Sequence, residues 1–201
     1  MPMAPCCTRC ATAPPCSRVR PCLCWVPRAA PAWRRCRSHA SWAHGSSLRA
    51  SPAKHAACPA AGAAAVVDYA AESWRDQIKA LAPAGVEVVF DAVGGPYAEP
   101  ALRSIAWGGR YLVVGFAAGD IPRIPLNLAL LKGCDILGVL YGTHVKRQPE
   151  ANRALMAQLF DWIAAGTLKP AIAHVWPLDR AAEALNLLLA RQVTGKIVLT
   201  T

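Results

Sequence analysis

Apolar and polar residues alternate in blocks along residues 51–201, and the blocks have the lengths of strands and helices. Residues 86–93 (VEVVFDAV) form a nearly continuous apolar run, which is typical of a strand covered on both faces of a sheet. Trp74, Ile78 and Leu81 recur at helical spacing. The pattern predicts strands at 65–69, 86–93, 110–116, 134–140, 171–176 and 196–199, with helices at 51–62, 72–81, 96–106, 150–165 and 180–190. This alternation predicts an α/β fold built on a mostly parallel sheet.

Composition separates the chain into two parts. Of the 201 residues, 54% are hydrophobic and 17% are charged, which excludes a wholly disordered protein, and no apolar run is long enough to span a membrane. The net charge of +10 is concentrated in residues 1–50, which contain eight Arg, no Lys and no acidic residue. Seven of the nine Cys also lie there, whereas residues 51–201 carry 14 basic and 12 acidic residues. The second part is close to balanced in charge, so it gives no reason to expect a specific nucleic-acid partner.

Four segments of the second part follow one another in an order and at spacings that resemble a known family. They are 65–69 (AVVDY), 88–95 (VVFDAVGG), 108–116 (GGRYLVVGF) and 193–199 (VTGKIVL). Together they resemble the cofactor-binding domain of the medium-chain dehydrogenase/reductases, in the zinc-independent NADPH:quinone oxidoreductase branch. The resemblance implies a Rossmann-type doubly wound parallel sheet, NADPH as cofactor, no metal, and hydride transfer from NADPH to a quinone or an activated enone.

The resemblance and the predicted strand ends indicate seven candidate cofactor-binding residues, and no catalytic residue. The candidates are Lys54, Tyr69, Ala92, Val93, Gly115, Phe116 and Lys196. Lys54 falls in the first turn of a predicted helix, where a cation opposes the helix dipole unless an anion such as the 2′-phosphate of NADPH binds there. Tyr69 and Lys196 match family positions near the cofactor, and the other four end strands at the carboxyl edge, where open α/β sheets bind ligands. A solvated helix lysine and a half-buried strand aromatic remain alternatives, and Asp91 is expected to bond local backbone.

Residues 1–50 lack the strand, Gly-rich turn and helix with which a dinucleotide-binding fold begins. Residues 21–33 (PCLCWVPRAAPAW) show neither strand alternation nor a phosphate loop. If each codon is rebuilt from the last base of one codon and the first two of the next, residues 25–32 can read Leu-Gly-Ala-Ala-Gly-Gly-Ala-Gly. Residues 42–47 can likewise read Met-Gly-Ala-Arg-Val-Ile, which resembles the second strand of the family. We interpret residues 1–50 as an out-of-frame reading of the nucleotide-binding segment.

Other interpretations of the first fifty residues stay open. An Arg-rich, acid-free N-terminus is typical of an organelle transit peptide, although seven prolines oppose the amphipathic helix that such a peptide needs. One Cys-x-x-Cys pair, Cys7 to Cys10, has no partner at the spacing of a common zinc module. A basic tail that binds nucleic acid by charge alone would be non-specific.

The sequence therefore predicts a disordered basic segment at 1–50 and an incomplete dinucleotide-binding domain at 51–201. The strand at 65–69 should lack its neighbour, the strand at 86–93 should be an exposed edge, and the half that begins at Glu150 should be the most protected part. The expected function is NADPH-dependent reduction of a quinone or enone, impaired here, in the cytoplasm and without membrane contact. The alternative is an inactive fragment that associates with intact relatives. The Cys134–Tyr141 region resembles the family's dimer edge, so a homodimer through it is expected.

Overall fold

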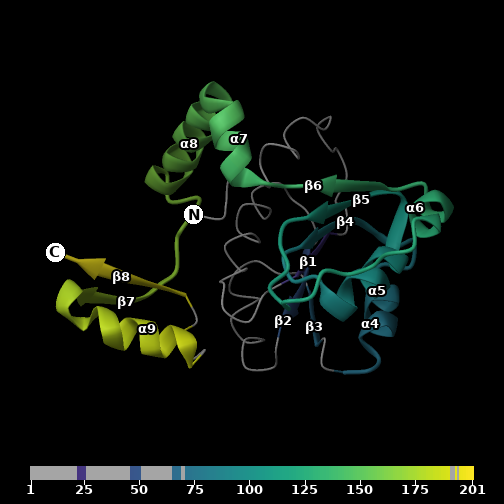
Figure 1. The fold of residues 1–201 in the computed structure, drawn as a ribbon, viewed down its shortest axis with the longest axis horizontal. Helices are drawn as coiled ribbons and strands as arrows, with labels where there is room; N and C mark the ends of the chain where they lie inside the picture. Colours follow the sequence, from purple (N-terminus) through teal and green to yellow (C-terminus); the bar gives the residue numbers. More distant parts are fainter. Residues whose placement is uncertain (1–21, 26–45, 51–64, 69–70, 191–192, 194) are drawn as a thin grey trace.

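The computed structural model describes residues 22–25, 46–50, 65–68, 71–190, 193 and 195–201. Its main feature is a six-stranded parallel sheet with the strand order β3-β2-β1-β4-β5-β6 (Figure 1). The strands are β1 (Cys22–Trp25), β2 (Ser46–Ala50), β3 (Ala65–Asp68), β4 (Val86–Asp91), β5 (Ile105–Val113) and β6 (Asp135–Gly138). This is the order of a Rossmann-type doubly wound sheet, and it confirms the predicted fold class.

Two strands of this sheet come from the segment that the sequence predicts to be disordered. β1 pairs with both β2 and β4, and β2 pairs with β3, so the prediction that the sheet lacks its first two strands is wrong. Parallel pairing uses backbone N–H and C=O groups. Proline alone lacks the N–H donor, and residues 22–25 (CLCW) contain no proline. The same residues are apolar, as a strand in the centre of a covered sheet requires. The rest of 1–50 lies outside the described residues.

The position of β4 also differs from the sequence-based prediction. β4 lies between β1 and β5, so its two edges are paired and it is not the exposed edge that the sequence predicts. Val89 and Phe90 are almost fully buried. The prediction was wrong because it assumed that no strand preceded residue 65.

Short helices cover one face of the sheet. They are α4 (Trp74–Leu81), the 3-10 helix η2 (Gly95–Tyr97), α5 (Ala98–Arg103) and α6 (Asn127–Lys132). Trp74 and Ile78 of α4 pack with Leu102 of α5 in the main core cluster, which Val89 and Tyr111 of the sheet complete. Trp74 and Ile78 therefore form the buried face, as their spacing predicts, whereas Leu81 at the end of α4 is 48% exposed. α6 was not predicted from the sequence.

The C-terminal part forms separate units. α7 (Tyr141–Arg147) and α8 (Pro149–Ala164) lead to a second sheet, in which β7 (Ile172–Pro177) pairs in parallel with β8 (Lys196–Thr200). The 3-10 helix η3 (Leu178–Arg180) and α9 (Ala181–Leu189) connect these two strands. Figure 1 shows this unit beside the main sheet, not added to it.

Burial in the C-terminal part is low. Ile172, Val175 and Leu189 are exposed by 52%, 58% and 79%. A two-stranded sheet has little surface on which to bury side chains, and parallel sheets are normally covered on both faces. The expectation that this half is the most protected part therefore disagrees with the burial pattern, which places the larger core among β3, β4, β5, α4 and α5.

Candidate functional site

The candidate site is formed by the loops that follow β4 and β5 at the carboxyl edge of the main sheet. We call residues 91–95 and 114–120 the strand-end loops. The amide of Val114 donates to the carbonyl of Asp91 at 2.8 Å, Ala117 donates to Ala92 at 3.2 Å, and Ala118 donates to Val93 at 2.9 Å. These bonds extend the β4–β5 pairing beyond the strands and hold the two loops against each other.

The strand-end loops bring four of the predicted residues together, namely Ala92, Val93, Gly115 and Phe116. A Cβ built on Gly115 would lie 3.5 Å from the carbonyl oxygen of Ala92, so the two backbones are in contact. Because β1 and β4 are neighbours while β2 lies on the other side of β1, the crevice of the doubly wound sheet opens at the carboxyl ends of β1 and β4. The loop after β4 lies at that crevice.

Two glycines give the first strand-end loop its shape. Gly94 and Gly95 have φ values of 66° and 61°, which L-residues with a side chain rarely adopt. A Cβ on Gly94 would lie 2.7 Å from Cδ1 of Phe116, and one on Gly95 would lie 2.9 Å from Cβ of Ala118. Gly94 and Gly95 are themselves buried, so the absence of their side chains lets the second strand-end loop pack directly against the first.

A buried carboxylate fixes the start of the same loop. Asp91, the last residue of β4, is 3% exposed. Its Oδ1 accepts hydrogen bonds from the amides of Val93 and Gly94, both at 2.8 Å, and its Oδ2 accepts one from the hydroxyl of Tyr111 on β5. The expectation that Asp91 bonds local backbone is confirmed. Three donors compensate the loss of water around this carboxylate, which would otherwise be costly to bury.

Tyr111 remains a proton donor under all ordinary conditions. Its side chain is 1% exposed, and burial raises the pKa of its hydroxyl well above the usual value. The negative charge of Asp91 and the hydrogen bond to it raise this pKa further, because both disfavour the phenolate.

Sequence reasoning did not select Tyr111 as a site residue. A tyrosine inside a buried strand needs a partner for its hydroxyl, and this was the available signal. The register pairs Tyr111 with Val89 and Asp91 with Val113, so Asp91 and Tyr111 stand two positions apart on neighbouring strands. Only the register between the strands places them in contact.

Of the three remaining predicted residues, only Lys196 belongs to the part of the chain that the structure describes. Lys54 and Tyr69 lie outside the described residues. Lys196 begins β8 in the second sheet, where its amide donates to the carbonyl of Ala171. Within the described ranges, no group of three or more His, Cys, Asp or Glu side chains could hold a metal ion.

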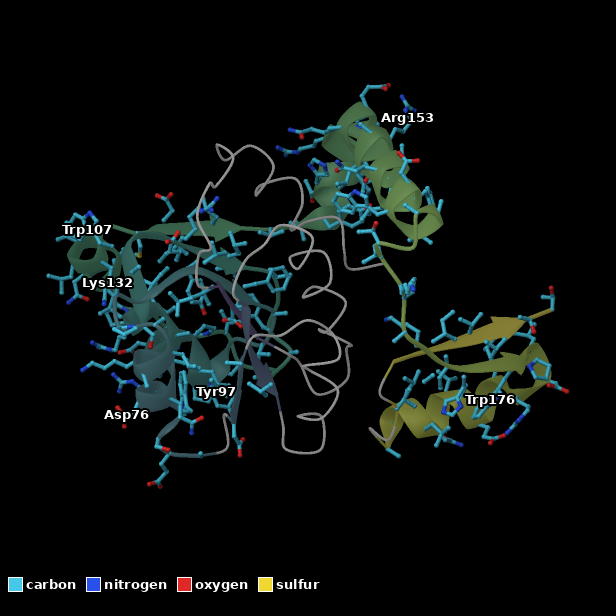
Figure 2. All side chains as sticks on the ribbon, turned by 180° about the vertical axis from the view of Figure 1, so that it is seen from behind. Asp76, Tyr97, Trp107, Lys132, Arg153 and Trp176 are labelled. Carbon is cyan, nitrogen blue, oxygen red and sulfur yellow. The ribbon has the colours of Figure 1, made fainter. Side chains whose placement is uncertain are left out.

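A cavity of about 360 Å³ lies at the opposite edge of the sheet. Its lining includes Arg75, Lys79, Arg103 and Lys132, with Asp76 as the acidic residue (Figure 2 labels Asp76 and Lys132). Lys79, Arg103 and Lys132 each lie in the last turn of a helix, where a cation stabilises the helix dipole. Because ligands of open α/β sheets bind at the carboxyl ends of the strands, we assign the candidate site to the strand-end loops.

The fold is that of a Rossmann-type dinucleotide-binding domain, and comparisons with known proteins agree. Residues 61–199 match the family model described as zinc-binding dehydrogenase. The chain therefore belongs to this family, and it is a member of the medium-chain dehydrogenase/reductases that resembles quinone oxidoreductases.

Two curated relatives have printed names of this kind. The quinone oxidoreductase-like protein 2 homolog of Nematostella vectensis is 39% identical over 142 residues, which cover 70% of this chain and 39% of that protein. The quinone oxidoreductase-like protein 2 of Mus musculus is 35% identical over 140 residues, 69% of this chain and 40% of that protein. The chain thus spans about two fifths of the length of these relatives.

Solved structures support the fold. A mycobacterial protein complexed with NADPH has a TM-score of 0.82 at 23% identity, over 97% of this chain and 60% of that chain. A quinone oxidoreductase of Pseudomonas syringae pv. Tomato DC3000 has a TM-score of 0.80 at 24% identity, over 92% and 58%. Among the described helices, none combines the length and apolar character needed to cross a bilayer.

Proposed function

We propose that this domain is built for the NADPH-dependent reduction of a quinone or an activated enone. The observation that carries the proposal is the pair of strand-end loops at the carboxyl edge of the sheet, which backbone hydrogen bonds and close packing at Gly94 and Gly95 hold together. The names of the relatives and the NADPH complex among the structural neighbours support it.

In this proposal Ala92, Val93, Gly115 and Phe116 form the wall against which the nicotinamide end of the cofactor binds. The cofactor supplies the hydride. The chain's own residues orient the cofactor, and the Phe116 ring, which is 40% exposed, is the aromatic side chain at this wall. Lys54 and Tyr69 remain the predicted contacts of the 2′-phosphate, and Lys196 remains a predicted contact from the last strand.

We further propose that cofactor binding is impaired in this chain. The pyrophosphate site of a doubly wound fold is the Gly-rich turn after the first strand, where backbone must approach the phosphates closely. β1 ends at Trp25, and residues 1–44 contain no glycine. Loss of this turn should weaken NADPH affinity by several kcal/mol, which is at least about a hundredfold.

The test compares the chain with a loop-restored variant. Residues 25–32 are replaced by Leu-Gly-Ala-Ala-Gly-Gly-Ala-Gly, and NADPH binding is followed by the fluorescence of the cofactor. We expect the variant, and not the natural chain, to show saturable binding in the micromolar range. Gly94→Ala in the restored variant is the control, since it alters the strand-end loop and should reduce the affinity again.

Two results would contradict the proposals. Micromolar NADPH binding by the natural chain would refute the impairment. A well-folded restored variant without any NADPH binding would refute the assigned cofactor. Oxidation of NADPH at 340 nm with a quinone or an enone as acceptor then tests the proposed substrate class.

We also propose that the chain pairs with a second copy, or with an intact relative, through the edge formed by β6. β6 is an end strand of the main sheet, and an unpaired strand edge can extend a sheet into another molecule. Ile136, Leu140 and Leu130, on and near this edge, are exposed by 39%, 72% and 79%. This association is the function that remains if the chain catalyses no reduction. A cytoplasmic location stays a prediction.

Light scattering after gel filtration tests the association. Leu140→Lys places a charge beside the β6 edge and should convert a dimer to a monomer. Leu189→Lys is the matched control, because Leu189 is 79% exposed on α9 and should leave the mass unchanged. A monomeric natural chain at high concentration would rule out the homodimer.

A further inference from the structure

We propose that Asp91 and Tyr111 form a positioning pair that sets the conformation of the first strand-end loop and, through it, the affinity for the nicotinamide cofactor. The inference rests on the proposed function for its ligand. Neither residue is assigned to contact the cofactor. Both act through the backbone of residues 92–95.

The geometry gives the pair control over the loop. Oδ1 of Asp91 accepts from two successive amides, those of Val93 and Gly94, at 2.8 Å each. One acceptor that binds both amides defines the direction in which the chain leaves β4. It also fixes the orientation of the peptide groups just before Gly94 and Gly95, the two residues with positive φ values.

Tyr111 in turn defines the rotamer of Asp91. A carboxylate can rotate about its Cβ–Cγ bond. The two amides bind only Oδ1, so they do not by themselves fix the position of Oδ2. The Tyr111 hydroxyl donates to this second oxygen from a strand whose register with β4 is set by the sheet. Since Tyr111 is 1% exposed, water has little access to replace the hydroxyl.

The consequence reaches the second loop as well. Ala117 and Ala118 donate to the carbonyls of Ala92 and Val93, so displacement of the first loop breaks the bonds that hold the second. The four residues assigned to the cofactor wall lie on these two loops. A change at the buried pair should therefore alter cofactor affinity without removing any group that touches the cofactor.

The experiment uses the full chain and two amino-acid changes of the same chemistry. Tyr111→Phe removes the hydroxyl that bonds Asp91. Tyr141→Phe removes a hydroxyl that donates to Oδ1 of Asn152 at 2.8 Å between α7 and α8, away from the site. Amide hydrogen exchange of residues 92–95 and 117–118 is measured by NMR, and NADPH affinity is measured by titration to millimolar concentration.

We expect Tyr111→Phe to speed exchange at the Val93 and Gly94 amides, and to weaken NADPH binding, by about tenfold each, because a hydrogen bond to a charged group is lost. Tyr141→Phe should change both by less than about twofold, since its lost bond is not at the site. Affinity of the folded chain does not depend on its overall stability, so this readout separates positioning from a structural role.

A second pair of variants covers the case in which Tyr111→Phe does not fold. Asp91→Asn keeps an oxygen that can accept from both amides, whereas Asp91→Ala keeps none. Asp91→Asn should keep loop exchange near that of the natural chain, and Asp91→Ala should not. Equal exchange in these two variants would overturn the proposal.

The remaining outcomes separate this inference from the proposed function. Unchanged loop exchange in Tyr111→Phe would overturn the positioning role whether or not NADPH binds. Faster loop exchange with unchanged NADPH affinity would overturn the link to the cofactor and leave the proposed function intact. A natural chain that binds no NADPH even at millimolar concentration agrees with the proposed impairment, and the effect of Tyr111→Phe on affinity is then measured in the loop-restored variant. A folded restored variant that binds no NADPH would refute the proposed function, and the cofactor link would fall with it.

Discussion

Gly94 allows a sharp test of the strand-end loop, because its conformation excludes a side chain. Its φ is 66° and its ψ is −144°, in a region that is essentially restricted to glycine. In the variant Gly94→Ala, holding a non-glycine residue in this region should cost about 1–3 kcal/mol of folding stability. The new Cβ would also lie 2.7 Å from Cδ1 of Phe116. Phe116 is 40% exposed, so its ring can rotate away, and the backbone cost should dominate.

The measurement is urea unfolding followed by fluorescence. With a slope of about 2 kcal/mol per molar urea for a small domain, a loss of about 2 kcal/mol lowers the midpoint by about 1 M. Gly115→Ala is the matched control on the neighbouring loop. Its φ is not in the left-handed region, and its Cβ would meet the Ala92 carbonyl at 3.5 Å, an ordinary contact. That variant should stay within about 0.5 kcal/mol of the natural chain.

The comparison of the two variants decides the argument. If Gly94→Ala unfolds at the same urea concentration as Gly115→Ala, the loop does not hold the left-handed backbone, and the cofactor wall built on it is refuted. If Gly115→Ala is the more destabilised of the two, contact between the loops outweighs backbone strain, and the predicted order of the two effects is refuted.

Three further predictions concern the two sheets and the buried tyrosine. Hydrogen exchange should be slower in Val86–Asp91 than in Lys196–Thr200, because β4 is paired on both sides while β8 pairs only with β7 among the described strands. Equal protection of the two strands would contradict this prediction. Leu102→Ala should lower the free energy of unfolding by about 2–5 kcal/mol in a denaturation experiment, since Leu102 is fully buried. Leu189→Ala should stay within about 0.5 kcal/mol of the natural chain, because Leu189 is 79% exposed. Similar losses in the two variants would contradict the assigned core. The raised pKa of Tyr111 means that above about pH 10 the unfolded chain releases a proton that the folded chain keeps, so stability falls with pH by up to about 1.4 kcal/mol per unit. Tyr111→Phe should lack this contribution, and parallel pH profiles of the two proteins would refute it.

Much of the fold could be predicted from local pattern. The apolar run that becomes β4 and the helical spacing of Trp74, Ile78 and Leu81 identified their elements, because burial on a sheet or a helix face imposes a period on the sequence. The carboxyl ends of two strands were predicted at Val93 and Phe116, slightly beyond the observed ends at Asp91 and Val113. The ligand site was predicted there because ligands of parallel sheets bind at the carboxyl edge. These features depend on neighbours along the chain or on a general rule of the fold.

Pairing between distant strands was decided only in three dimensions. Residues 22–25 carry no alternation that marks a strand, yet β1 lies at the centre of the sheet because its backbone groups can pair with β2 and β4. The separation of β7 and β8 into a sheet of their own was likewise not visible in their apolar pattern.

The site shows the same division. Asp91 could be placed at the end of a strand from the sequence alone, and its bonds to Val93 and Gly94 are local. Its contact with Tyr111 spans twenty positions and depends on the register of β4 against β5. Sequence by itself indicated the strands from β3 onward and placed their carboxyl ends to within about three residues, because these features follow from burial and local hydrogen bonding. Tertiary structure decided which strand ends meet, because register is a property of two strands and not of either one.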